Sequence, residues 1–253
     1  MIIRCSHFTR GIVILFAVAV WQISASESQH STNTFERGCA AYEARDFAEA
    51  ARQFNDELKR KPSAEAWRNL GNAEWQGSHF GEAILAWERA LWINPFDADA
   101  GASLRHARRT AQLAAAPLRW WERFSTWLPV DAWGWTATVS FWLAVTLAFG
   151  LPVFLGWRRS AWTQSLAAVG FGLFLLTIPG MVGVHTRTDL GVVLSSDTPL
   201  RLTPTRHAQI NTRLAAGEMA GGQSIRGDYI FIHTSSGDSG WIEKSQFRFI
   251  SKP

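Results

Sequence analysis

Two long apolar runs without charged residues dominate the hydrophobic pattern of the chain. They cover residues 133–155 and 162–184, and neither contains Asp, Glu, Lys or Arg. A helix rises about 1.5 Å per residue, so either run is long enough to cross the roughly 30 Å hydrocarbon core of a bilayer. The pattern predicts two transmembrane helices, at 132–156 and 162–184, joined by a short hinge at 157–161. The parts of the chain before and after this hairpin then lie on the same side of the membrane.

The placement of tryptophan supports the hairpin. Of the 14 tryptophans, eight lie at or near the ends of the two runs: Trp120, Trp121, Trp127, Trp133, Trp135, Trp142, Trp157 and Trp162. Indole rings favour the headgroup level of a membrane. Arg158 and Arg159 are the only charges in the hinge, which favours a cytoplasmic hinge. Three arginines on the opposite side dilute that signal: Arg119, Arg123 and Arg187.

The first 25 residues resemble a secretory signal peptide. Arg4 and Arg10 form a basic start, residues 11–20 form a short apolar core, and residues 24–26 are small enough for cleavage. An uncleaved N-terminal anchor is the alternative. In both cases the following segment is exported. We therefore expect a multi-pass protein of the bacterial inner membrane, with its N- and C-terminal domains in the periplasm.

Residues 31–97 are self-similar with a period near 34 residues. The second copy, at 64–97, carries a characteristic set of small and large residues: Trp67, Leu70, Gly71, Phe80, Ala83, Trp87, Ala90 and Pro95. This spacing resembles the tetratricopeptide repeat, in which small residues let two helices approach and large residues fill the gap. The sequence departs from the family at Glu74, where Tyr is usual, and at Trp87, where Phe is usual. Trp75 could supply the bulk that is missing at Glu74.

The first copy, at 31–62, is weaker but in register. It keeps Gly38, Phe47, Ala50, Phe54, Leu58 and Pro62, whereas Thr34 and Arg37 replace the expected Trp and Leu. A further helix at 97–114 would cap the stack, because a solenoid does not leave its last apolar face open. We therefore expect two tetratricopeptide repeats with a capping helix over 31–114.

The resemblance implies a binding groove on the concave side of the repeats. Family geometry places five residues there: Tyr42, Glu65, Arg68, Asn72 and Trp75. Such grooves hold extended peptides or a partner's helix. The alternative for any one of these residues is a solvated helix face.

Residues 115–131 form a separate amphipathic segment. Large apolar residues recur there at helical spacing: Leu118, Trp121, Phe124, Trp127 and Leu128. This pattern predicts a short helix in the plane of the lipid headgroups. The alternative is an early start of the first span, against which Pro129 and Asp131 argue.

The C-terminal residues 188–253 change to short β segments separated by turns. Apolar or alternating pieces lie at 191–194, 200–202, 229–232 and 240–242. About sixty residues of this kind suit a small five-stranded barrel. The order resembles the bacterial SH3-like fold, through Leu200-Arg201-Leu202-Thr203-Pro204 and the closing Gly240-Trp241-Ile242. We expect Gly240 to allow close approach of strands and Trp241 to fill part of the core.

No pattern in the sequence predicts a catalytic, cofactor or metal site. The formal net charge is +4 and the charges are scattered, which argues against nucleic acid. The two cysteines, Cys5 and Cys39, form neither a disulfide framework nor a metal motif. The string 237–240 reads Gly-Asp-Ser-Gly, as in chymotrypsin-like proteases, and His233 is nearby. The β region is too short for two barrels, so we interpret the string as a hairpin turn.

The predicted fold class is multidomain, with an α-solenoid of tetratricopeptide repeats, two transmembrane helices and a C-terminal SH3-like β-barrel. The order of these parts resembles the BatE proteins of the Bacteroides-aerotolerance operon. That resemblance implies a non-catalytic membrane scaffold linked to stress or oxygen tolerance. It also implies von Willebrand factor A-domain membrane proteins and a MoxR-type ATPase as partners. The alternatives are a peptidoglycan-binding module that recruits a partner and, last, a protease or hydrolase acting through Ser239.

Overall fold

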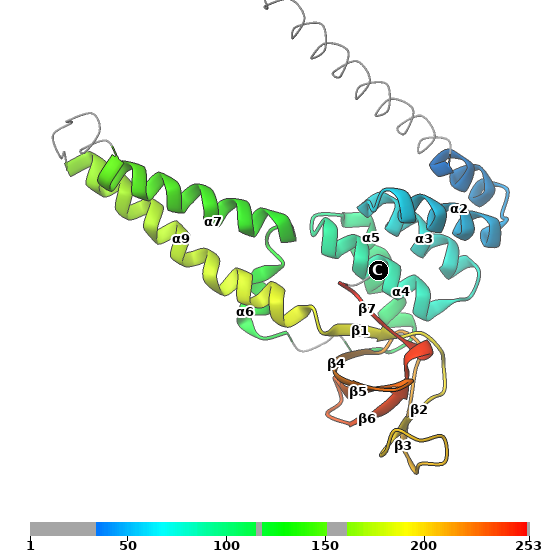
Figure 1. Ribbon diagram of the computed structural model, residues 1–253. Helices are drawn as coiled ribbons and strands as arrows, with labels where there is room; N and C mark the ends of the chain where they lie inside the picture. The colour runs from blue at the N-terminus through cyan, green and yellow to red at the C-terminus, as the bar shows by residue number, and fades with distance from the viewer. Residues whose placement is uncertain (1–33, 115–117, 151–160, 252–253) are drawn as a thin grey trace, which may run out of the picture.

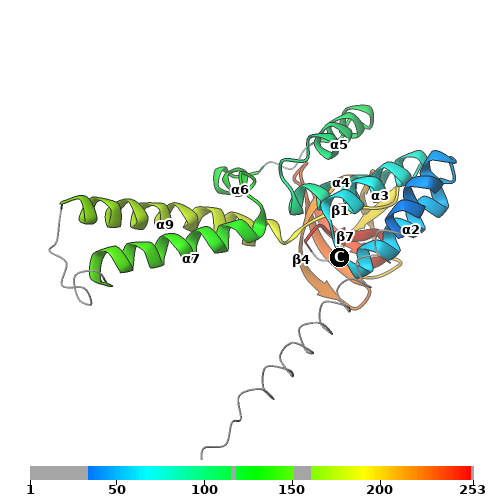
Figure 2. The same ribbon diagram turned by 90° about the horizontal axis from the view of Figure 1, so that it is seen from above.

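The computed structural model describes residues 34–114, 118–150 and 161–251. It consists of a helical block, a long helical hairpin and a β-sheet (Figure 1). Seen from above, the hairpin extends away from the side on which the helical block and the sheet lie together (Figure 2). The predicted signal segment at 1–25 and the predicted hinge at 157–161 fall outside the described residues, apart from Ala161 at the start of the second long helix.

The helical block contains antiparallel helix pairs. A helix over 34–43 is followed by α2 (Phe47–Arg60), α3 (Ala64–Gln76), α4 (Phe80–Ile93) and α5 (Ala98–Thr110). Asp46, Ser63 and Asp97 accept hydrogen bonds from backbone N–H groups in the first turns of α2, α3 and α5. These side chains satisfy donors that have no partner inside the helix, so they define where each helix begins.

The backbone confirms the period of the repeats. Arg45, Ser78 and Gln112 all have positive φ, at 62°, 66° and 52°, and each follows the first helix of a pair. Non-glycine residues rarely adopt this conformation, so its recurrence at equivalent positions marks the same turn three times. The third turn shows that α5 corresponds to the first helix of a further repeat.

Glycine and an aromatic ring form the central contact of each repeat. A Cβ added at Gly38 would lie 2.7 Å from the ring of Phe54, and one at Gly71 would lie 2.6 Å from Nε1 of Trp87. Phe54 and Trp87 are almost fully buried. The indole of Trp87 therefore takes the place of the expected Phe without disturbing the packing of the helices.

The long hairpin is formed by α7 (Val130–Val145) and α9 (Ala161–Arg187). A π-helical turn, Thr146–Gly150, continues α7. Both helices are long and apolar enough to cross a membrane by length and composition. The end of the first apolar run, beyond residue 150, lies outside the described residues.

The predicted amphipathic helix is shorter than expected. Within the described part of 115–131, α6 (Trp120–Ser125) is helical, Trp127 and Leu128 lie in the turn that follows it, and α7 already begins at Val130. The hydroxyl of Ser125 donates to the carbonyl of Glu122, and the indole N–H of Trp133 donates to the Ser125 carbonyl at 3.0 Å. This contact between α6 and α7 uses the last carbonyl of the short helix. Residues 126–129 consequently reverse the chain into α7 instead of prolonging α6.

The C-terminal region forms a sheet of seven strands, not the five that we expected. They are β1 (Leu190–Val193), β2 (Thr198–Arg201), β3 (Ile210–Leu214), β4 (Met219–Arg226), β5 (Tyr229–Thr234), β6 (Ser239–Glu243) and β7 (Phe247–Phe249). Their order in the sheet is β3-β2-β6-β5-β4-β1-β7, and every pairing is antiparallel. The additional strands β3, β4 and β7 are polar, glycine-rich or very short, which is why their apolar pattern is weak.

The expectation for Gly240 is confirmed, and Trp241 is buried as expected, at 9% exposed. A Cβ at Gly240 would lie 2.7 Å from the carbonyl oxygen of Arg201, so the close approach requires glycine. Ile242 belongs to the buried cluster between the strands, and side chains alternate between the two faces of a strand, so Trp241 lies on the opposite face. There it is covered in part by the ring of Phe231, at 5.2 Å between ring centroids.

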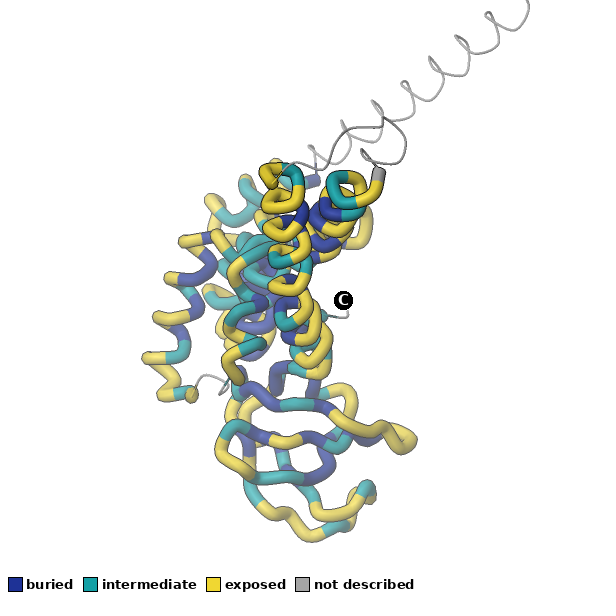
Figure 3. The backbone as a smooth tube through the Cα atoms, turned by 90° about the vertical axis from the view of Figure 1, so that its left-hand side faces the viewer, coloured by how far each residue is buried: buried dark blue, intermediate teal, exposed yellow. Residues whose placement is uncertain are grey.

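The sheet packs directly on the helical block. Val192, Met219 and Ile250 belong to the same buried cluster as the helices of the repeats. A Cβ at Gly81 of α4 would overlap the carbonyl of Leu194, which follows β1. Arg89 of α4 donates from Nη2 to the carbonyl of Phe249 in β7 at 2.9 Å. Buried positions are continuous through the repeats and the sheet, whereas exposed positions recur along the hairpin (Figure 3).

Candidate functional site

Two of the five predicted groove residues meet in a small depression of about 180 Å³. Tyr42 contributes from the helix over 34–43 and Asn72 from α3, beside Cys39 and Asn69. The amide oxygen of Asn72 accepts a hydrogen bond from Nε1 of Trp87 at 3.1 Å, which holds it at the floor. This depression lies on the side of α3 where the resemblance to the repeat family predicts binding.

The other three predicted residues occupy the same face of α3 but not the depression. Glu65 is exposed, and Arg68 pairs with Asp97 at the start of α5, with 3.0 Å between Nη1 and Oδ2. Trp75 packs edge-on against Phe80 at 4.8 Å between ring centroids. Arg68 and Trp75 therefore fasten α3 to its neighbours, and the binding role of all five residues stays a prediction.

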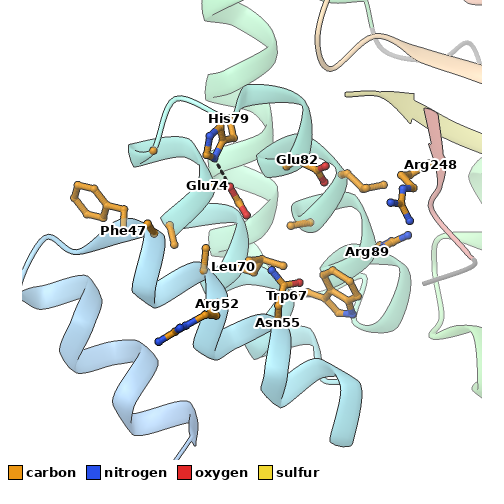
Figure 4. Close-up of a pocket in the computed structure, with 16 residues that line it drawn as sticks. Phe47, Arg52, Asn55, Trp67, Leu70, Glu74, His79, Glu82, Arg89 and Arg248 are labelled. Carbon is orange, nitrogen blue, oxygen red and sulfur yellow. Dashed lines mark hydrogen bonds and ion pairs between the residues drawn. The ribbon is translucent and has the colours of Figure 1, made fainter. Parts of the chain in front are cut away.

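A larger pocket, of about 760 Å³, opens on the opposite side of α3 (Figure 4). We call it the α2–α4 pocket. Four elements line it: α2, α3, α4 and strand β7, which contributes Arg248. Its floor is formed by small or apolar side chains, and its polar side chains are Arg52, Asn55, Glu74, His79, Glu82, Arg89 and Arg248.

The pocket exists because a bulky side chain is missing. Glu74 occupies the repeat position at which the family usually has Tyr, and it lines the pocket. Trp75, the proposed source of the missing bulk, packs on the other side of α3, with its ring 5.7 Å from that of Trp87. The alanines Ala48, Ala51, Ala73 and Ala86 leave the remaining space open. The expectation that Trp75 compensates for Glu74 is therefore wrong at this surface.

Arg89 is the most buried charge of the pocket. Its residue is 8% exposed, and its guanidinium carbon lies 4.7 Å from the ring centroid of Trp67. Burial lowers the pKa of Arg89 to about 10, with Glu82 opposing the change and Arg248 adding to it. The group remains a cation at neutral pH, but in surroundings where a counter-charge interacts strongly with it.

The pocket also contains two acidic side chains, of which Glu82 lies near Arg89 and Arg248. Glu74 and His79 are in hydrogen-bonding contact, with 2.7 Å between Oε2 of the glutamate and Nδ1 of the histidine. Desolvation raises the pKa of Glu82, and Glu74 raises it further, whereas Arg248, Arg89 and His79 act in the opposite direction. In Figure 4, Glu82 lies between the Glu74–His79 pair and Arg248, and Arg89 lies next to Arg248.

Sequence reasoning missed this pocket. Its one visible sign was the exchange of Tyr for Glu74, which breaks the pattern of the repeat. Arg248 could not be placed from the sequence, because it is more than 150 positions away from Arg89 in the chain. Only the packing of β7 on α4 brings these two arginines to one pocket.

The string that resembles a protease loop forms a hairpin turn. Gly237 has a φ of 95°, the Thr234 N–H donates to the Asp238 carbonyl, and the Asp238 N–H donates to the Thr234 hydroxyl. Ser239 and His233 are cross-strand partners in β6 and β5. Asp238 accepts from the hydroxyl of Ser236. In the portion of the chain that the structure describes, no three His, Cys, Asp or Glu side chains are grouped to hold a metal ion.

Comparison with known families supports the assignment of the helical block. Residues 35–103 match the model of a tetratricopeptide repeat family. No curated protein matches the chain. The matched stretch covers the helices that line the depression at Tyr42 and Asn72 and the helices that line the α2–α4 pocket. Strand β7, which contributes Arg248 to the pocket, lies outside it. Repeats of this kind mediate binding between proteins, which is the coarse function that the match supports.

Proposed function

We propose that this protein is a non-catalytic scaffold, anchored in the bacterial inner membrane by its helical hairpin, that binds a partner protein through its tetratricopeptide repeats. The match of residues 35–103 to the repeat family carries this proposal. The open groove at Tyr42 and Asn72 supplies a surface of the kind that the family uses.

The membrane anchor is supported by the distribution of large and small side chains in the hairpin. Leu175, Leu176 and Ile178 of α9 are all about half exposed, whereas Gly170, Thr177 and Gly180 are buried against α7 or α6. A soluble helix pair buries its large apolar residues. A membrane pair instead buries small residues and turns large ones to the lipid. The exposed apolar surface of this hairpin needs a solvent other than water.

We propose that the repeats and the sheet lie together in the periplasm. A two-span hairpin returns the chain to its starting side, and the shared core of the repeats and the sheet requires one compartment for both. The resemblance to the BatE proteins further suggests von Willebrand factor A-domain membrane proteins as partners and a role in stress or oxygen tolerance. We retain the SH3-like fold for the sheet as part of the same proposal.

Cysteine labelling in intact cells tests this topology. In a chain without Cys5 and Cys39, single cysteines would replace the exposed Ala102 of α5, Ser236 of the β5–β6 turn, or Ser160 of the hinge. An impermeant maleimide should label the first two positions in cells whose outer membrane has been permeabilised, and the third only after lysis. Labelling of Ala102→Cys and Ser236→Cys from opposite sides would refute the arrangement.

Site-directed photo-crosslinking tests the groove. A benzophenone amino acid at Tyr42 should capture a partner in native membranes, and an A-domain membrane protein is the expected product. The matched control is the same amino acid at Arg105, an exposed position of α5 outside both pockets. Equal capture from both positions would show that the groove has no special role.

A peptidoglycan-binding role is the second candidate, because the exposed Arg226 lies over an aromatic pair that is mostly covered, with Trp241 9% exposed. The rings of Phe231 and Trp241 are 5.2 Å apart, and Arg226 lies 5.6 Å from the ring centroid of Trp241. Since the sheet shares its core with the repeats, the full chain in detergent is the material for a pull-down on purified peptidoglycan. Retention that is lost in Trp241→Ala would favour this role.

We infer that catalysis is not the function of this chain. Ser239 is the first residue of strand β6, directly after the hairpin turn. The carboxylate of Asp238 accepts a hydrogen bond from the hydroxyl of Ser236. The variant Ser239→Ala should therefore complement a deletion strain as well as the parent chain. Loss of complementation with normal protein levels would revive the hydrolase hypothesis.

A further inference from the structure

We propose that the α2–α4 pocket is a second binding site, separate from the groove, and that it takes a carboxylate group of a short peptide segment. The two sites lie on opposite sides of α3, so both can be occupied at once. This site would let one set of repeats hold two protein segments.

Two arginines from different parts of the fold form the proposed carboxylate site. Arg89 comes from α4 and Arg248 from β7, and both line the pocket (Figure 4). Arg89 is fixed in position by Trp67 and by its hydrogen bond to the Phe249 carbonyl. A guanidinium presents its donors in a planar fork that matches a carboxylate, and a fixed guanidinium loses little freedom on binding.

The rest of the pocket matches a peptide better than a polyanion. Leu70, Leu85 and the alanines of the floor offer apolar contact to small side chains. Glu74 and Glu82 lie beside the arginines, so a ligand with several negative charges is repelled where one carboxylate is accepted. The volume of about 760 Å³ falls within the range of pockets that enclose small ligands. A peptide segment with one carboxylate can pair with the arginines, and its backbone N–H groups can donate to the carboxylates of Glu74 and Glu82.

The carboxylate could come from an acidic side chain or from a chain end. Three pools of fluorescent pentapeptides separate these sources, each with mixed residues at the outer positions. One pool has a central Glu and an amidated end, the second a central Gln and a free end, and the third a central Gln and an amidated end. The probe is tested on the purified full chain in detergent micelles by fluorescence anisotropy.

We expect at least one of the carboxylate pools to bind about tenfold more tightly than the uncharged pool, the scale of one charge-assisted hydrogen bond. Arg248→Gln should abolish this preference, and the exposed Arg105→Gln should leave it unchanged. The pool that binds identifies the source of the carboxylate. Equal binding of all three pools, absence of binding by both carboxylate pools, or a preference that survives Arg248→Gln would overturn the proposal.

A filling substitution gives an independent test that leaves both arginines in place. Glu74→Tyr restores the bulky residue of the repeat family and should occupy part of the pocket. We expect carboxylate binding to fall at least about tenfold while the helix content and unfolding temperature are kept. Undiminished binding in a folded Glu74→Tyr chain would show that the ligand binds elsewhere. The Tyr42 crosslink reports on the groove separately, so failure of either site can be recognised.

Discussion

Single small residues in the repeats determine how closely neighbouring helices can pack. Gly71 is the clearest case, because the indole of Trp87 lies where its side chain would be. Interiors of proteins are packed densely enough that even one added carbon is felt. Glu74 illustrates the opposite case. It stands where the family usually has Tyr, and without the ring of a tyrosine a pocket remains beside it. The same helix α3 therefore shows both consequences of close packing.

We expect Gly71→Ala to destabilise the protein by about 1–3 kcal/mol, the usual cost of overpacking a core. The added methyl group would lie 2.6 Å from Nε1 of Trp87, which is itself held by Asn72. Chemical denaturation of the detergent-solubilised chain measures the change. Gly134→Ala is the matched control, because a Cβ at Gly134 meets nothing within 4 Å. Equal effects of the two substitutions would contradict the packing argument.

The raised pKa of Glu82 predicts a pH-dependent effect of Glu82→Gln. When the folded-state pKa of a carboxyl lies above its ordinary value, ionisation costs stability at neutral pH. That cost is relieved as the pH falls through the folded-state pKa towards the ordinary value of 4.5. Glu82→Gln should therefore raise the unfolding temperature at pH 7, and the gain should disappear towards pH 4.5.

The exposed Glu36→Gln serves as the control for removing a glutamate from the same block. Thermal unfolding across the pH range gives the comparison. A Glu82→Gln gain that grows as the pH falls would have the wrong sign and would refute the assigned shift.

At the scale of elements, the hairpin and the repeats both use small residues to let neighbouring segments approach closely. In the repeats, glycines admit aromatic rings from neighbouring helices. In the hairpin, Gly170 lies against Ala144 and the carbonyl of Ser140, and Gly180 lies against the ring of Trp133. The repeats direct their large residues inward, and the hairpin directs many of its large residues outward. This reversal is the main physical argument for a lipid surrounding.

Two glycines on opposite sides of α9 test the packing of the hairpin. A Cβ at Gly170 would lie 3.3 Å from the Ser140 carbonyl oxygen, whereas one at Gly172 meets nothing within 4 Å. We expect Gly170→Leu to separate α7 from α9 at a cost of about 1–3 kcal/mol. Gly172→Leu should be neutral, because a side chain at this position points away from α7 into open space. Unfolding by increasing SDS in mixed micelles measures both, and equal destabilisation would contradict the assigned faces.

At the scale of the whole molecule, the repeats, the hairpin and the sheet meet at one junction. Arg187 at the end of α9 lies 4.9 Å from the ring centroid of Trp92 in α4 and donates to Ser125 of α6 at 3.2 Å. The sheet packs on α4 through residues next to β1 and β7. The repeats and the sheet are therefore joined to the hairpin by contacts as well as by the chain, and the orientation of the repeats follows from that of the hairpin.

Gly81→Val should separate the sheet from the repeats. A side chain at Gly81 would overlap the backbone of Leu194, which cannot yield as a flexible side chain would. We expect faster proteolysis after α9 and weaker carboxylate binding at the α2–α4 pocket, because Arg248 moves away with β7. Gly77→Ala is the control, since its Cβ would make only ordinary contacts at 3.4 Å. Unchanged proteolysis in Gly81→Val would show that the junction tolerates the overlap.

The elements predicted best are those whose pattern is local. The repeats follow from Gly71 and Trp87 at their family spacing, and the long helices follow from two uncharged runs. The sheet was predicted less well, with five strands expected and seven found. Strands such as β3, which is largely exposed, carry little apolar pattern and form because a neighbour offers hydrogen bonds.

The sequence by itself determined where helices pack closely and where apolar surface is continuous, because both depend on residues a few positions apart. Only the tertiary structure decided that Trp241 packs on the face opposite Ile242, that Trp75 leaves the space beside Glu74 open, and that Arg248 joins Arg89. These outcomes depend on the register of strands and on the docking of the sheet on α4. Both are set by contacts between residues far apart in the chain, which no local pattern records.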